Sequence, residues 1–132
     1  MIILEEIVAK LRDYPEVRYI VAPDSITVYP LRDDGFEVSL HIEEQAPILN
    51  LTVFFNGWHE EFSNADDALN CFAMGLTKDC RLKEWSRGEK AYKWSLEILQ
   101  GGEWETYSTT ALFFAPYWRT KNERYLQNDL VK

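Results

Sequence analysis

The sequence predicts an α+β domain in which helices pack on one face of a curved antiparallel sheet of about eight strands. Two segments carry apolar residues at helical spacing, most other segments alternate apolar and polar residues, and turn residues separate the alternating segments. The predicted order is a helix, five strands, a second helix, three strands and a short helix. The length of 132 residues, without a linker or low-complexity tract, predicts one domain over residues 1–132.

The first half is predicted to begin with an amphipathic helix over residues 2–14. Apolar side chains recur there at helical spacing, and Pro15 ends the helix because the residue before proline avoids helical geometry. Strands are predicted at 17–21, 26–29 and 36–43. The last of these alternates most cleanly, so its polar side is predicted to face water.

A tight hairpin is predicted at Asn56-Gly57. Asn-Gly is the strongest short hairpin signal, because both turn positions need positive φ. The two-residue loop fixes the register, so Phe55 opposes Trp58 and Val53 opposes Glu60. Glu60 is therefore predicted on an otherwise apolar face.

The second half is predicted to begin with a helix over residues 64–77. Ser63 and Asp66 resemble a capping box before apolar residues at helical spacing. Glycine turns then separate three strands, predicted at 81–87, 90–100 and 103–114. A two-residue turn between the first two would place Glu84 opposite Lys93 as an ion pair.

The C-terminal end is predicted to form a short helix. Thr120 with Glu123 is another capping-box pattern, and residues from 128 onward are predicted to fray.

Composition excludes several classes of partner. A net charge of -8, with basic residues scattered along the chain, excludes nucleic acid as a direct partner. No stretch approaches the roughly 20 apolar residues that a membrane span requires. The N-terminus lacks the basic start and long apolar run of a secretory signal, so the sequence predicts a cytoplasmic protein. The aromatic content of 14% is predicted to fill the core.

Neither the cysteines nor the histidines predict a metal or cofactor site. Cys71 and Cys80 lack metal-ligand and redox-pair spacing, and His41 and His59 lack the spacing of zinc ligands. Basic neighbours would lower the thiol pKa of Cys80, but no histidine or resolving cysteine accompanies it. Both thiols are predicted to be spectators, and both histidines to be surface residues.

The densest polar-aromatic cluster is Trp58-His59-Glu60-Glu61. Histidine beside carboxylates is the usual material of acid–base catalysis. Neighbours on a strand point to opposite faces, so His59 shares a face with Glu61, whereas Glu60 alone faces the apolar side. Two interpretations stay open: Glu60 is a proton donor or acceptor, or it reaches water from an edge strand, and the second is favoured.

Two further groups are candidate ligand or partner contacts. A pocket between sheet and helices would be lined by Trp58, Trp94 and Tyr107, with Glu60 as its polar or acid–base group. A hydroxyl face beside Trp104 is the other group, and it is formed by Ser95, Thr106, Ser108 and Thr110. Such a face is ordinary on a solvated sheet, but it also suits a polar ligand or a partner's edge strand.

The C-terminal aromatic group is Tyr117, Trp118 and Arg119. If these side chains are exposed, two rings and a guanidinium have the composition of a binding hot spot. If the short helix folds over them, they anchor it, and this second interpretation is somewhat favoured.

The function predicted from these observations is a non-catalytic protein-binding domain. It would use an open sheet face or the C-terminal aromatic group to bind a protein partner or a second copy of itself as a homodimer, and its acidity would favour a basic partner. The alternative is a small-molecule-binding protein or small enzyme that uses Glu60. No cofactor is predicted for either class.

Overall fold

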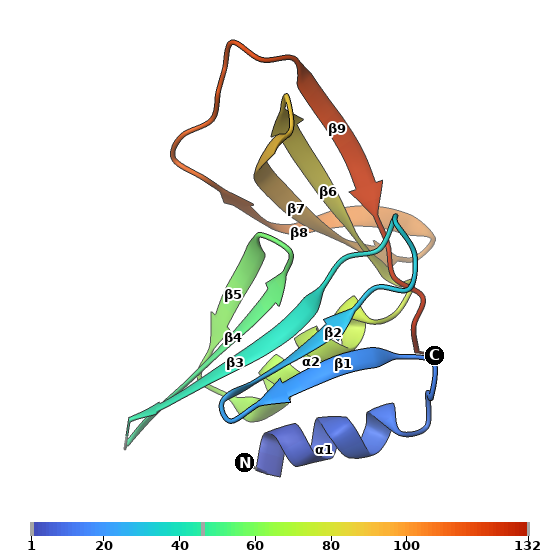
Figure 1. The fold of residues 1–132 in the computed structure, drawn as a ribbon, viewed down its shortest axis with the longest axis vertical. Coiled ribbons are helices and arrows are strands. Elements are labelled where there is room, and N and C mark those ends of the chain that lie inside the picture. The colour runs from blue at the N-terminus through green and yellow to red at the C-terminus, as the bar shows by residue number, and fades with distance from the viewer. Residues whose placement is uncertain (1, 46, 132) are drawn as a thin grey trace.

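The computed structural model of the chain describes residues 2–45 and 47–131, which form two helices and nine strands (Figure 1). The helices are α1 (Ile2–Leu11) and α2 (Ala65–Gly75). The strands of the first half are β1 (Arg18–Ala22), β2 (Ser25–Tyr29), β3 (Val38–Gln45), β4 (Ile48–Phe55) and β5 (Trp58–Phe62). Those of the second half are β6 (Cys80–Arg87), β7 (Lys90–Gln100), β8 (Glu103–Ala111) and β9 (Lys121–Leu126). The α+β class and the antiparallel pairing are confirmed.

The strands divide between two sheets where the sequence predicted one. β1 to β5 form a five-stranded sheet in chain order, and the second sheet has the order β8-β7-β6-β9. The helix α2 stands between β5 and β6, and these two strands do not pair with each other. Residues of β5 instead lie close to β7 and β8 of the second sheet, and the side chains of β5 form hydrogen bonds with those of β8.

Both helices pack on one face of the five-stranded sheet, as predicted. Figure 1 shows α2 behind the strands and α1 along their lower edge. Alternate residues of the strands point toward the helices, so the helices bury the apolar face of the sheet. The core so formed includes Leu4, Ile7 and Leu11 of α1, Ala68 and Phe72 of α2, and Ile26, Leu40, Val53 and Phe55 of the sheet.

The β4–β5 hairpin has the predicted register. Phe55 pairs with Trp58 and Val53 pairs with Glu60. Asn56 adopts a φ of 52°, but Gly57 does not adopt a positive φ. Glycine is required at position 57 for lack of space, because a Cβ there would lie 2.3 Å from the ring of Trp94.

The N-cap of α2 lies one residue later than predicted. The side chain of Asn64, and not that of Ser63, accepts the backbone N–H of Asp67 at 3.2 Å. Asparagine is among the best N-cap residues, so the cap and the helix still agree with the local sequence.

The predicted pairing of Glu84 with Lys93 is wrong. A register shift between Trp85 and Ser86 places Glu84 opposite Trp94. Glu84 is buried and accepts hydrogen bonds from Trp94 Nε1 at 2.8 Å and from Arg124 Nε at 2.7 Å. The bulge thus removes the predicted surface ion pair between Glu84 and Lys93. Glu84 is buried instead, with a charge-assisted hydrogen bond from Arg124 and a second hydrogen bond from Trp94.

The predicted C-terminal helix is also wrong, because residues 121–126 form the strand β9. It pairs antiparallel with β6, and Leu126 lies buried opposite Leu82. β6 offers a free edge of backbone donors and acceptors, and pairing with that edge outweighs the local capping-box pattern of Thr120 and Glu123.

Asn128 is buried, although the sequence predicted fraying from this residue onward. Its side chain accepts the N–H of Phe36 at 3.1 Å and donates to the carbonyls of Phe36 at 3.0 Å and Gly75 at 2.9 Å. Gly35 permits this approach, because a Cβ there would lie 2.6 Å from Asn128 Oδ1. The residues after β9 therefore fasten the second sheet to the first half of the chain.

Candidate functional site

Most of the predicted site residues of β5, β7 and β8 meet where the two sheets face each other, at a contact we call the inter-sheet seam. It consists of Trp58, Glu60, Trp94, Tyr107 and Ser108. Trp58 has 0% exposure, and its indole N–H donates to Ser108 Oγ at 2.9 Å. A buried tryptophan needs such a partner for its N–H, so Ser108 completes the packing of Trp58.

Glu60 bridges the sheets through Tyr107. The Tyr107 hydroxyl donates to Glu60 Oε2 at 2.8 Å, and the Trp58 and Tyr107 rings meet edge to face with centroids 6.3 Å apart. The hydrogen bond to Glu60, followed by burial, raises the pKa of Tyr107 to about 12. Glu60 lines neither of the two cavities described below.

The predicted hydroxyl face is divided by a bulge between Leu96 and Glu97. Thr110 points toward β5, where its hydroxyl accepts the backbone N–H of His59 at 3.3 Å. On the opposite side of the sheet, the hydroxyls of Ser95 and Thr109 lie 2.6 Å apart. The hydroxyls therefore serve both faces of the sheet, and two of them hold the sheets together.

The two histidines lie on the outer face of the five-stranded sheet, with Phe54 between them. Ring centroids are 5.1 Å apart for His41 and Phe54, and 5.4 Å apart for Phe54 and His59. His41 and Phe54, but not His59, line a shallow depression of about 240 Å³ together with residues such as Ser39 and Asn56. Over residues 2–45 and 47–131, no three His, Cys, Asp or Glu side chains are grouped so that they could hold a metal ion.

Both cysteines are buried free thiols. Burial raises the pKa of Cys71 and that of Cys80 to about 12. For Cys80 the neighbouring Asp79 carboxylate also raises the pKa, and Cys80 Sγ donates to the Met74 carbonyl at 3.2 Å. The expectation that basic neighbours lower the thiol pKa of Cys80 is therefore wrong.

Trp104 lies on the outer face of the second sheet, in a row of alternating cations and rings. The guanidinium of Arg81 lies 4.3 Å from the centroid of Trp104 and 4.1 Å from that of Tyr125. The row continues through Lys83, Trp85 and Lys93, with ammonium-to-centroid distances of 4.8 Å for Lys83 and 4.6 Å for Lys93 over Trp85. Stacking of this kind keeps the charges in water while the rings are covered.

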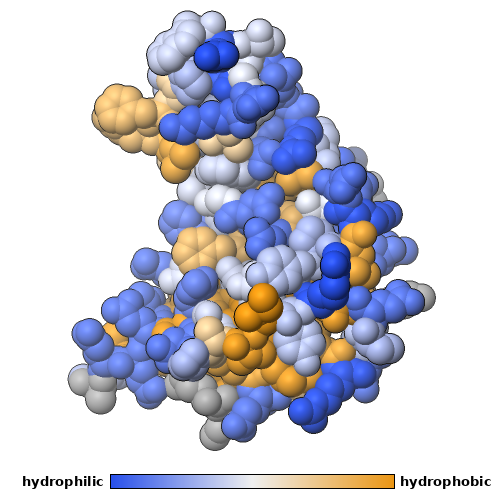
Figure 2. Space-filling model, in the orientation of Figure 1, coloured by the Kyte–Doolittle hydropathy of each residue, from blue (hydrophilic) through white to orange (hydrophobic). Residues whose placement is uncertain are grey.

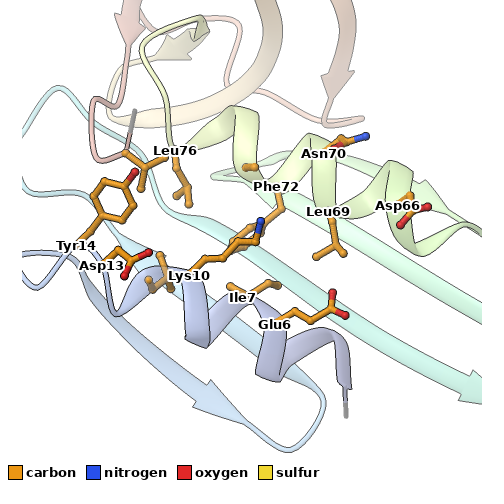
Figure 3. A pocket seen from close by; sticks show the side chains of 13 residues that line it. Glu6, Ile7, Lys10, Asp13, Tyr14, Asp66, Leu69, Asn70, Phe72 and Leu76 are labelled. Atoms are coloured by element: carbon orange, nitrogen blue, oxygen red, sulfur yellow. The ribbon is translucent and has the colours of Figure 1, made fainter.

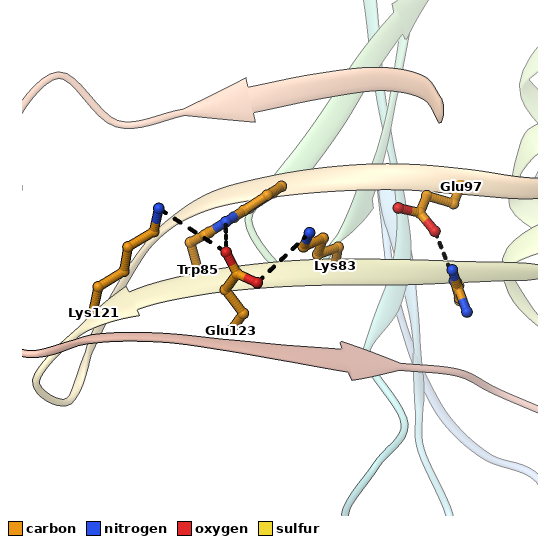
Figure 4. Close-up of polar contacts among 6 residues, drawn as sticks. Lys83, Trp85, Glu97, Lys121 and Glu123 are labelled. Atoms are coloured by element: carbon orange, nitrogen blue, oxygen red, sulfur yellow. Dashed lines mark hydrogen bonds and ion pairs between the residues drawn. The ribbon is translucent and has the colours of Figure 1, made fainter. Parts of the chain in front are cut away.

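Carboxylates bind this row from the side (Figure 4). Glu97 Oε1 pairs with Arg81 Nε at 2.7 Å. Glu123 accepts the indole N–H of Trp85 at 2.8 Å and pairs with Lys83 at 3.7 Å. Arg81 and Lys83 therefore have carboxylate partners within the chain, and Lys93 stacks on Trp85, which explains the face as a packed surface.

Tyr117, Trp118 and Arg119 lie in the connection between β8 and β9, and the rings are exposed. We call residues 112–119 the aromatic loop. Tyr117 is 64% exposed and Trp118 is 83% exposed. The interpretation that a helix covers these rings is wrong, because residues 121–126 form β9.

Two phenylalanines, which the sequence assigned to the end of a strand, extend the aromatic loop. Phe113 is 86% exposed and Phe114 is 74% exposed, and their rings meet edge to face at 4.8 Å. Figure 2 shows a hydrophobic projection at the upper left, where Figure 1 places this loop. The adjacent phenylalanines are a usable signal, since two neighbours on one strand cannot both face a core.

The base of the aromatic loop is held by the β6–β7 turn. Ala115 is buried, Arg87 Nη1 donates to the Arg119 carbonyl at 3.5 Å, and the Arg87 guanidinium lies 5.9 Å from the ring of Tyr117. Arg87 Nε is buried without a hydrogen-bond partner. The loop is therefore attached at its base while its rings project.

A groove of about 700 Å³ separates α1 from α2 (Figure 3). We call it the helix groove. Its apolar wall is formed by Ile7 and Leu11 of α1, Leu69, Phe72 and Leu76 of α2, and Val131. This volume lies within the range of small-molecule and peptide pockets. The predicted pocket residues Trp58, Trp94 and Tyr107 do not line it.

Comparison of the chain with models of protein families, with curated proteins and with solved structures finds no match. Among the described residues, no helix is long and apolar enough to cross a membrane.

Proposed function

We propose that the chain is a non-catalytic, cytoplasmic protein-interaction domain that binds its partner through the aromatic loop. One observation carries the proposal: Phe113, Phe114, Tyr117 and Trp118 are all exposed in one short connection. Clustered large apolar side chains on a protein surface mark interaction sites, whereas single ones need no explanation.

The chemistry of the loop supports a protein partner. Tryptophan, tyrosine and arginine are the residues most enriched in binding hot spots, and Tyr117, Trp118 and Arg119 supply all three in sequence. Rings lose little conformational entropy on binding, and a base attached through Arg87 and Ala115 reduces the ordering cost further.

The geometry gives less support to a small molecule bound at Glu60. The carboxylate accepts a hydrogen bond from Tyr107, and the neighbouring Trp58 is buried. A ligand would have to open the inter-sheet seam in order to reach Trp58.

Quantitative affinity capture from an extract of the host cell tests the proposal. The tagged wild-type chain is compared with a Phe113→Ser/Trp118→Ser variant and with Ile48→Ser. Ile48 is a matched control, since it is 67% exposed but lies at the start of β4, in the five-stranded sheet. Partners are expected to fall by at least about tenfold with the loop variant and to stay with the control. Capture of the same proteins by both variants would contradict the proposal.

A further inference from the structure

The helix groove and the aromatic loop have complementary properties but lie far apart on one molecule. Figure 1 shows the groove helix α1 at the bottom and the loop beside β9 at the top. The loop therefore cannot enter the groove of its own chain without unfolding. A second molecule can supply it.

The shapes of the two surfaces correspond. The groove is an apolar slot between two helices, with a volume of about 700 Å³. The loop presents the Phe113 and Phe114 rings as a knob, with centroids 4.8 Å apart. Rings that fill a pocket and exclude water are the usual centre of a protein interface.

The rim of the helix groove is acidic. Glu6, Asp13 and Asp66 border it and are exposed, and Lys10 is the basic residue at its edge. The loop ends at the exposed Arg119, and Lys121 follows it. Opposite charges around an apolar contact favour association in one orientation.

The net charges of the two halves of the chain favour the same contact. Residues 1–77 carry four Lys or Arg and fourteen Asp or Glu, which gives a net charge of -10. Residues 78–126 carry nine Lys or Arg and seven Asp or Glu, which gives a net charge of +2. The half that holds the groove therefore attracts the half that carries the loop, although two whole molecules of net charge -8 repel each other.

We infer that the chain associates with a second copy of itself, with the aromatic loop of one molecule seated in the helix groove of the other. This contact is heterologous, because two different surfaces meet. The inference rests on the proposed function, since it names the partner of the aromatic loop. A contact this small belongs among weak interfaces, so a dissociation constant on the order of 10–100 μM is expected.

Each surface can be altered without disturbing the core. On the loop, Phe113→Ser/Phe114→Ser removes the knob from two exposed positions. In the groove, Ala73→Arg fills the slot from an exposed position of α2. Ala9→Arg is the matched control, because Ala9 is an exposed alanine of α1 that does not line the groove. Circular dichroism and thermal unfolding verify the fold of each variant.

Sedimentation velocity over a concentration series is the test. The wild type and Ala9→Arg are expected to self-associate alike, whereas the knob variant and Ala73→Arg each weaken association by about 30-fold or more. An equimolar mixture of these two variants is expected to regain association, because one partner retains an intact groove and the other an intact knob. A loop-to-loop dimer would not be rescued by mixing.

Three results would overturn the inference: a wild type that stays monomeric at about 1 mM, association that survives Ala73→Arg, or a mixture that stays monomeric. If the chain is monomeric but host partners are still lost with the loop variant, the inference fails and the proposed function stands. If the loop substitutions change neither self-association nor the capture of host partners, both the inference and the proposed function fail.

Discussion

The inter-sheet seam and the aromatic loop are both rich in aromatic residues, but the polar groups of the seam rings are hydrogen-bonded within the chain, whereas the rings of the loop are exposed. Tyr107 is the half-exposed ring of the seam. In the seam, Trp58 is buried and its indole N–H reaches Ser108, while Tyr107 reaches Glu60. In the loop, Phe113 and Trp118 project into water.

The comparison separates stability from binding. Rings that are packed and hydrogen-bonded within the chain stabilise the fold, and their removal leaves a cavity or an unpaired polar group. Rings that contact water contribute little to folding and lower the solubility of the chain. A cluster of them on the surface therefore indicates a binding partner. The seam is therefore expected to govern the free energy of unfolding, and the loop to govern association.

Trp58→Ala gives the largest expected effect. Removal of this fully buried ring should lower the free energy of unfolding by about 4 kcal/mol, through lost burial and the cavity that remains. Trp118→Ala is the matched control in the loop and should change it by less than about 0.5 kcal/mol. Urea denaturation of both variants measures the difference, and equal losses would break the comparison.

Asn128→Ala should be nearly as costly, because it deprives three buried backbone groups of their partners. The Phe36 N–H and the Phe36 and Gly75 carbonyls would lose hydrogen bonds, with an expected loss of about 3 kcal/mol. Asn122→Ala is the matched control, because Asn122 is exposed and lies outside this buried hydrogen-bond network. A loss no greater than that of Asn122→Ala would show that the attachment of the C-terminal residues is unimportant.

Ser108→Ala sharpens the comparison within the seam. It leaves the Trp58 indole N–H without its acceptor, so a loss of about 1 kcal/mol is expected. Ser63→Ala is the control, since Ser63 is exposed and Asn64 provides the helix cap. Chemical denaturation that cannot distinguish the two alanine variants would contradict the role of this hydrogen bond.

The smallest effect within the seam concerns the titration of Tyr107. Its pKa is raised from 10.0 to about 12, chiefly by the hydrogen bond to Glu60. The folded state therefore holds the phenolic proton more tightly than the unfolded state. The resulting stabilisation is complete below pH 10 and is lost as the pH rises to about 12.

Glu60→Gln should return the pKa of Tyr107 toward its ordinary value. The phenolate absorbance of the wild type minus that of Tyr107→Phe isolates this one tyrosine. A wild-type Tyr107 that titrates like a free tyrosine, with no change in Glu60→Gln, would mean that the two side chains are not bonded in solution.

Local signals predicted the first half of the chain well. The Asn56-Gly57 turn determines the register of β4 and β5, because a two-residue loop leaves one pairing in which the apolar residues share a face. The helices were predictable for the same reason, since Leu4, Ile7 and Leu11 form a single stripe. Here local pattern and tertiary burial agree.

The second half depends on contacts between residues far apart in the chain. The bulges at Trp85 and at Leu96 leave no mark in the sequence pattern, yet each changes which residues face each other. β9 is a strand because β6 has a free edge, and Asn128 is buried because Gly35 leaves room for it.

The candidate site was predicted in part. The sequence singled out Tyr117, Trp118 and Arg119, but their exposure depends on whether a helix or a strand follows them. Phe113 and Phe114 were assigned to a strand, which ends at Ala111 instead. The sequence grouped Trp58, Trp94 and Tyr107 with Glu60 as a pocket between sheet and helices, whereas in the structure Tyr107 contacts Trp58 and Glu60 where two sheets face each other.

The most direct test of the account is the free energy of unfolding of a chain in which Phe113, Phe114, Tyr117 and Trp118 are all replaced by serine. Urea denaturation should give a value within about 1 kcal/mol of the wild type, because these rings contact water in the folded chain. A loss of about 3 kcal/mol or more would show that the rings anchor the fold, which would contradict their assignment to a binding surface.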